Sequence, residues 1–198
     1  NKGERTFVSS LINQPICYVT AENNDLELLK KSFESMGRKV AILDYAPDDY
    51  CLHTLEFGSA GIDAQVAIFD CINKKVDTLI VTAETLNSNF APLKVWQRNT
   101  FEICKNQDIE IEKLGKMLTS IGYNRVETVD ARGQWAKRGD VVDIFPLNSE
   151  LPYRVHFFDT QVEKITTFNI LTQFKISEVE QFCICPNGFT LEESDKLD

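Results

Sequence analysis

The residue types that most often carry chemistry are cysteine, histidine and closely spaced carboxylates, and in this chain they are scattered. The cysteines are Cys17, Cys51, Cys71, Cys104, Cys183 and Cys185, and the histidines are His53 and His156. A structural zinc site needs sulfur and nitrogen ligands clustered at short spacings, and no two of these cysteines form a C-x-x-C pair. We therefore expect no metal site, and we interpret the cysteines as small buried residues in a reducing compartment.

Two carboxylates, Asp140 and Asp143, lie close together in the sequence. Charged residues beside a strand are common, and no nucleophile or base accompanies this pair, as acid–base or covalent catalysis would require. We interpret His156 as a solvated strand residue. The sequence therefore predicts that this chain by itself is not an enzyme and binds no cofactor.

The chain carries a net charge of −9, and both halves contribute to it. Residues 1–97 contain 9 basic and 13 acidic side chains, a balance of −4, and residues 98–198 contain 12 basic and 17 acidic ones, a balance of −5. Proteins that bind nucleic acids usually present a basic stripe that displaces counterions from the phosphates. We therefore predict that the chain alone does not bind duplex DNA stably, and that its partner is a protein.

No apolar run approaches the roughly 20 residues that span a bilayer. The first residues of the sequence are polar and lack the apolar core of a signal peptide. These features predict a cytoplasmic protein that does not bind membranes.

The first half of the sequence alternates between strands and helices. Short β-prone apolar runs stand at 16–20, 40–43 and 78–82, separated by helical patterns that begin after residue 25 and at about residue 63. Gly37 is expected to end the first helix, because glycine readily adopts the left-handed conformation found there. This order predicts a layer of parallel strands joined by right-handed helical crossovers.

The second half predicts a smaller α+β domain with a mainly antiparallel sheet. A strand at 100–105 and a helix at 109–121 precede a series of short strands. These strands are expected at 125–129, 134–137, 141–145, 154–158, 162–168 and 179–185. We place the boundary near residues 92–99, which gives domains at 1–97 and 98–186 and a tail, or the start of a further domain, at 187–198.

Three segments of the second half combine into a recognisable block. Residues 122–126 read GYNRV, residues 133–146 read GQWAKRGDVVDIFP, and residues 149–159 read SELPYRVHFFD. This block resembles one that the excinuclease protein UvrB shares with the bacterial transcription-repair coupling factors. Residues 167–173, TFNILTQ, are more similar to the coupling-factor form of the following segment than to the UvrB form.

The first half is similar, more weakly, to the ATPase-like lobe that precedes this block, mainly over residues 79–86. A working phosphate loop needs glycines, a lysine and a hydroxyl group. The corresponding place here holds Gly3, Arg5 and Thr6, so we interpret it as a degenerate phosphate loop and expect no ATP binding. The resemblance thus implies a degenerate helicase/ATPase-like lobe, and the interval between Leu43 and Asp63 leaves no room for the long DNA-binding hairpin of UvrB.

The resemblance implies an adaptor module that binds the excinuclease protein UvrA and recruits nucleotide excision repair to a stalled RNA polymerase. The parent protein would be an ATP-dependent DNA translocase that contacts RNA polymerase and DNA through domains absent from this chain. Two alternatives stay open. The chain could be a UvrB-like, ATP-dependent module for verifying DNA damage, or a clamp that holds the intact protein inactive by packing on its C-terminal domains.

The family block carries three candidate partner-binding residues, Arg138, Arg154 and Phe158. Arginine and aromatic side chains dominate interface hot spots. Because Arg154 and Phe158 are four residues apart on one strand they share a face, whereas Phe157 must face the opposite side. We therefore expect an exposed patch of these three residues whose alanine variants keep their melting temperature.

Structural roles are the alternative for each of the three candidates. Arg138 could pair with Asp140 or Asp143, and Phe158 could belong to the core. Three other large residues of the block, Trp135, Tyr123 and Phe145, are interpreted as packing residues.

Overall fold

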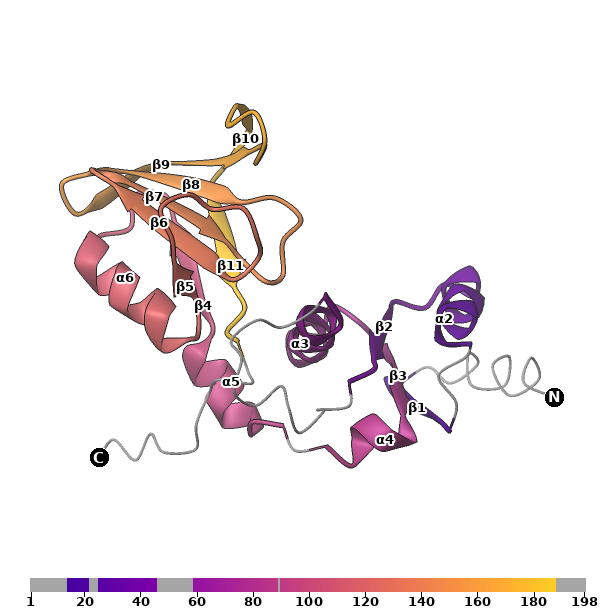
Figure 1. Cartoon of the computed structure of the whole chain (residues 1–198). Helices are drawn as coiled ribbons and strands as arrows, with labels where there is room; N and C mark the ends of the chain where they lie inside the picture. The colour runs from indigo at the N-terminus through magenta and orange to yellow at the C-terminus, as the bar shows by residue number, and fades with distance from the viewer. Residues whose placement is uncertain (1–13, 22–24, 46–58, 89, 188–198) are drawn as a thin grey trace. The chain divides into compact units, whose positions relative to one another are not determined.

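A computed structural model describes residues 14–21, 25–45, 59–88 and 90–187 (Figure 1). The chain divides into two compact units, Asn1–Asn89 and Phe90–Asp198. The described residues form a mixed α/β structure with both parallel and antiparallel strands. No helix in these ranges has the length and apolar character needed to cross a membrane.

The first unit contains a three-stranded parallel sheet. Its strands are β1 (Ile16–Thr20), β2 (Val40–Leu43) and β3 (Thr78–Thr82), in the order β1-β3-β2. Both outer strands pair in parallel with β3, so the predicted parallel layer is confirmed.

Helix α2 (Leu26–Ser35) packs on one face of this sheet. Its buried residues Leu26, Leu29 and Phe33 recur at helical spacing and contact Ile80 of β3, as an amphipathic helix requires. Gly37 adopts φ +83° just after the helix, which confirms its predicted role in ending α2.

Two further helices complete the first unit. Helix α3 (Ser59–Ile72) precedes β3, and the short helix α4 (Ala83–Leu86) follows it directly. The side chain of Thr82 caps α4 by accepting a hydrogen bond of 3.2 Å from the backbone N–H of Thr85. The turn after β3 is therefore a capped helix start.

The second unit begins with helix α5 (Leu93–Asn99), whose Trp96 is buried. The sequence pattern predicts the domain boundary within this stretch. In the structure this stretch includes a helix with a buried side chain, and the division between the two compact units lies between Asn89 and Phe90.

A six-stranded sheet dominates the second unit, in the order β10-β9-β8-β7-β6-β5 (Figure 1). Its strands are β5 (Asn124–Arg125), β6 (Gln134–Arg138), β7 (Val141–Phe145), β8 (Tyr153–Phe158), β9 (Gln161–Phe168) and β10 (Lys175–Val179). Strands β4 (Phe101–Cys104) and β11 (Gln181–Ile184) form a separate antiparallel pair. The predicted antiparallel series from β6 to β9 is confirmed.

Two details of the sheet differ from the prediction. Strand β5 is only two residues long and runs parallel to β6, because the chain leaves the sheet after Val126 and buries Val129 against Ala136 and Phe145. Strand β10 was not predicted, since four of its five residues are exposed and give no apolar alternation. It lies at the edge of the sheet and pairs with β9 through an irregular register.

Helix α6 (Ile111–Ser120) covers one face of the six-stranded sheet. Leu114 and Leu118 are fully buried, and Gly115 lies directly against the ring of Trp135 on β6. The burial of Trp135, Tyr123 and Phe145 confirms that these residues serve packing.

The hydroxyl group of Tyr123 connects three segments of the second unit. It donates a 2.8 Å hydrogen bond to the carbonyl of Cys185 and accepts one of 3.0 Å from the backbone N–H of Leu147. Burial raises the pKa of Tyr123 well above its ordinary value, so the group acts here as a neutral phenol.

The contact between α6 and β6 gives a test of the fold. A Cβ atom at Gly115 would lie 2.6 Å from Cη2 of buried Trp135, so Gly115→Ala should destabilise the chain by about 1–3 kcal/mol through overpacking. Helix propensity acts in the opposite direction by about 1 kcal/mol, so a net stabilisation would show that α6 does not press on Trp135. Urea denaturation measures the difference, with exposed Lys113→Ala on the same helix as the control.

Candidate protein-interaction surface

The two faces of the six-stranded sheet differ in character. One face carries Trp135, Val142 and Ile144 and lies against α6. The opposite face, here called the outer face, is defined by Arg138, Asp143, Arg154, His156 and Phe158. Strand pairing places Asp143 opposite Arg154, and Val141 opposite both Arg138 and His156, so these side chains occupy neighbouring rows.

Phe158 is the most exposed aromatic side chain of the outer face. It is 75% exposed, whereas its neighbour Phe157 is only 5% exposed. This alternation along β8 confirms the prediction that the two phenylalanines face opposite sides of the sheet. Folding therefore leaves a large apolar ring in water at the end of β8.

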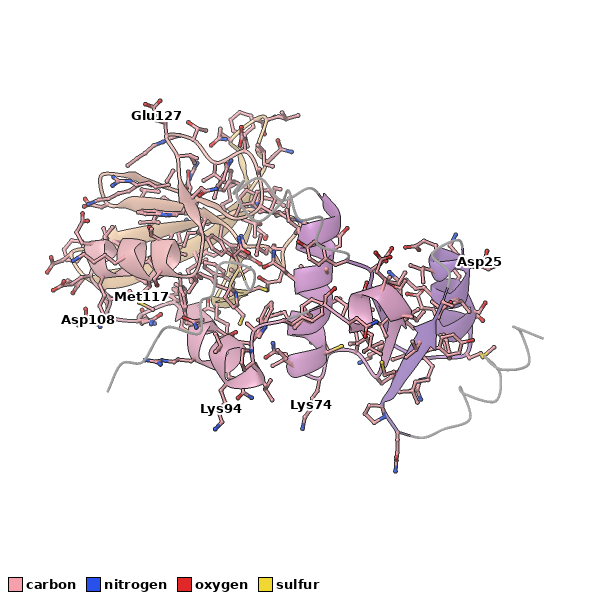
Figure 2. All side chains as sticks on the ribbon, turned by 60° about the horizontal axis from the view of Figure 1, so that its bottom comes forward. Asp25, Lys74, Lys94, Asp108, Met117 and Glu127 are labelled. Atoms are coloured by element: carbon pink, nitrogen blue, oxygen red, sulfur yellow. The ribbon has the colours of Figure 1, made fainter. Side chains whose placement is uncertain are left out.

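Arg138 is exposed at the end of β6 and is held by the segment before that strand. Its Nε and Nη2 atoms donate to the carbonyl of Glu127 at 3.3 and 3.1 Å, and Nη2 also donates to Oγ1 of Thr128 at 2.6 Å. Glu127 lies at the outer edge of the unit (Figure 2). Arg138 thus uses a backbone carbonyl, and not Asp140 or Asp143, to orient its guanidinium group.

Arg154 differs from the expectation of a free, exposed arginine. Its Nε and Nη2 atoms donate to the two carboxylate oxygens of Asp143 at 2.7 and 2.9 Å, and Nη2 also donates to Oε1 of Gln173 at 2.8 Å. Its guanidinium carbon lies 4.4 Å from the ring centre of Phe168. The bond to Asp143 raises the pKa of Arg154, and only 22% of the side chain is exposed. We call this cluster of Arg154, Asp143, Gln173 and Phe168 the Arg154 clasp.

Sequence reasoning missed the contributions of Asp143 and Gln173. Asp143 was considered only as a catalytic carboxylate or a partner of Arg138. Gln173 stands in the TFNILTQ segment, where the side chain of Asn169 accepts hydrogen bonds from the backbone N–H groups of Leu171 and Thr172. This turn brings Gln173, at φ +60°, back to Arg154. The only sequence signal for this contact was the TFNILTQ segment itself. Its resemblance to the coupling factors did not indicate that Gln173 would bind Arg154.

His156 lies between Arg154 and Phe158 on the outer face and is half-buried. Partial burial, followed by the nearby charges of Lys164 and Arg154, lowers the pKa of His156 below its ordinary value of 6.5. The carboxylates of Asp143 and Glu163 act in the opposite direction. The folded protein therefore favours the neutral form of the His156 imidazole more than water does.

The remaining candidate groups do not form a site in the described ranges. Gly3, Arg5 and Thr6 of the degenerate phosphate loop lie outside the described residues. No group of three histidine, cysteine, aspartate or glutamate side chains that could hold a metal occurs in the described ranges. Cys185 is buried as predicted, but Cys17 is exposed on edge strand β1, and burial raises the pKa of Cys71 to about 11.

The part of the chain that carries the outer face is similar to a known protein family. Residues 101–188, which include the sheet, α6 and β11, match the family of the UvrB interaction domain. This stretch of the second unit is similar to the UvrB interaction domain. This match confirms the resemblance read from the GYNRV, GQWAKRGDVVDIFP and SELPYRVHFFD segments.

Curated relatives are transcription-repair-coupling factors. The protein of Bacillus subtilis (strain 168) is 28% identical over 187 residues, which cover 91% of this chain and 16% of that protein. The protein of Haemophilus influenzae is 32% identical over 61% of this chain, and that of Escherichia coli (strain K12) is 34% identical over 54%. The chain spans only 16%, 10% and 9% of the length of these three relatives.

The Arg154 clasp changes the expected effect of an alanine substitution on the stability of the second unit. Arg154→Ala leaves the buried carboxylate of Asp143 without its cation, so it should destabilise the chain by about 3 kcal/mol. Arg138→Ala should stay within about 0.5 kcal/mol, because Arg138 is exposed. Urea denaturation of both variants checks this contrast, and equal stabilities would show that the clasp contributes nothing.

His156 gives the domain a predictable response to acid. Since its pKa is lowered on folding, the unfolded chain binds the proton more readily, and stability should fall as the pH drops below 6.5 towards the folded pKa. His156→Gln should lose this part of the pH dependence. Melting temperatures of both proteins between pH 7.5 and about pH 5 give the comparison, and parallel curves would rule out a contribution from His156.

Proposed function

We propose that this chain is the adaptor module of a transcription-repair coupling factor and that its outer face binds the excinuclease protein UvrA. The single observation that supports this most is that Phe158 and Arg138 are both exposed on the outer face, within the residues that match the UvrB interaction domain. A large aromatic ring and an oriented arginine are the residue types that most often carry protein–protein binding energy.

The energetics of the outer face favour a protein partner. Phe158 gains nothing from folding while it is 75% exposed, and covering such a ring stabilises a complex by roughly 1.5–3 kcal/mol. Arg138 can offer a charged donor to a carboxylate, because its fork is already oriented by Glu127. The net charge of −9 makes nucleic acid a poor partner for the chain as a whole.

The proposal also covers the full-length coupling factor of which this chain would be a part. In it, the module recruits nucleotide excision repair in the cytoplasm to RNA polymerase stalled on DNA, while an ATP-dependent DNA translocase in other parts of the protein supplies movement. The first unit is proposed to be a degenerate ATPase-like lobe without a cofactor, an interpretation supported by its three parallel strands. The domain limits 1–97 and 98–186 belong to this proposal.

A titration with purified UvrA tests the proposal. Phe158→Ala and Arg138→Ala should each weaken binding by about 2 kcal/mol, roughly thirtyfold, with unchanged melting temperatures. Phe174→Ala is the matched control for Phe158, since Phe174 is 76% exposed on the loop before β10. Arg125→Ala is the control for Arg138, because Arg125 is exposed but lies over the ring of Trp135 on the opposite face.

Three results are informative. Loss of binding by the two outer-face variants alone supports the proposed surface. Equal losses in the two control variants would show that the contact is not specific to this face. Absence of any complex with the unaltered chain would overturn the proposed function.

A further inference from the structure

Asp143 is the only acidic side chain that is buried among the described residues. Its side chain is 4% exposed, and both of its oxygens accept hydrogen bonds from Arg154. A buried ion pair is weak evidence for stability, since apolar residues of similar volume often stabilise a fold as well or better. Stability alone therefore does not explain why a carboxylate is buried at this position.

The geometry around Arg154 indicates such a role. A carboxylate that accepts from both Nε and Nη2 fixes the plane of the guanidinium group. Gln173 holds Nη2 from the side of the TFNILTQ turn, and the ring of Phe168 lies 4.4 Å from the guanidinium carbon. Among the described residues no acceptor meets Nη1, so one edge of the group is held in place and still able to donate.

We propose that Asp143 is a positioning residue of the partner-binding surface: together with Gln173 it holds Arg154 in one orientation, so that the Nη1 edge is preset to meet an acceptor on the partner. This inference rests on the proposed function of the outer face. An arginine that is already ordered loses less conformational freedom on binding than a mobile one, so the clasp raises affinity without contacting the partner itself.

The test uses the full chain and purified UvrA. Asp143→Asn is nearly isosteric, but it replaces one accepting oxygen with an amide N–H₂ that cannot accept from Arg154. It should weaken binding by roughly tenfold, as expected for one lost charge-assisted hydrogen bond. Asp140→Asn is the matched control, because it removes the same charge from the exposed turn before β7 without touching the clasp.

A double-mutant cycle separates positioning from a general structural effect. If Asp143 acts through Arg154, then Asp143→Asn should cause no further loss in an Arg154→Ala background. Additive losses would show that Asp143 affects binding by another route and would overturn the inference. All affinities are measured at a temperature where circular dichroism shows each variant to be folded.

Gln173→Ala keeps the proposal testable if Asp143→Asn fails to fold. It removes one acceptor from Arg154 but leaves the pair with Asp143 intact, and it should also weaken binding only when Arg154 is present. Wild-type affinity in Gln173→Ala and in any folded Asp143→Asn sample would refute the positioning role. If the unaltered chain does not bind UvrA at all, the proposed function fails instead, so the two failures are distinguishable.

Discussion

The outer face depends on the ion pair between Arg154 and Asp143. Burying a charged carboxylate is costly unless a cation lies close to it, and for Asp143 the adjacent strand supplies that cation. Pairing of β7 with β8 supplies it directly, because Asp143 and Arg154 are partners in the register. Gln173 then joins the turn after β9 to the same pair. A single guanidinium group thus connects two strands and a turn.

Much of this face could be predicted from the sequence, because the relevant rules are local. The period of two along a strand was enough to separate Phe157 from Phe158 and to place Arg154 with Phe158. Glycine at the end of a helix predicted where α2 stops. The family block predicted which strands would form the sheet, and the order from β6 to β9 followed.

The partners of the arginines could not be predicted in the same way. Sequence reasoning considered Asp143 for Arg138, which is close to it in the chain. The register between β7 and β8 assigns Asp143 to Arg154 instead, and that register is set by the seven residues between the strands, not by the charges. The parallel strand β5 and the exposed strand β10 were missed for a related reason, since their pairing depends on distant residues and leaves little apolar pattern.

The pairing of β4 with β11 has a consequence for how the second unit is made. Phe101 pairs with Ile184, and Cys104 with Gln181. Most of the sequence of the second unit therefore lies between these two paired strands. Closing a loop of about 80 residues costs on the order of 4 kcal/mol of chain entropy, so we expect the sheet formed by the intervening residues to fold before β4 and β11 pair. On the ribosome, where a chain emerges from its N-terminus, β4 is made early but has no strand partner until β11 has been synthesised. We therefore expect the first strand of the unit to be among the last to find its partner.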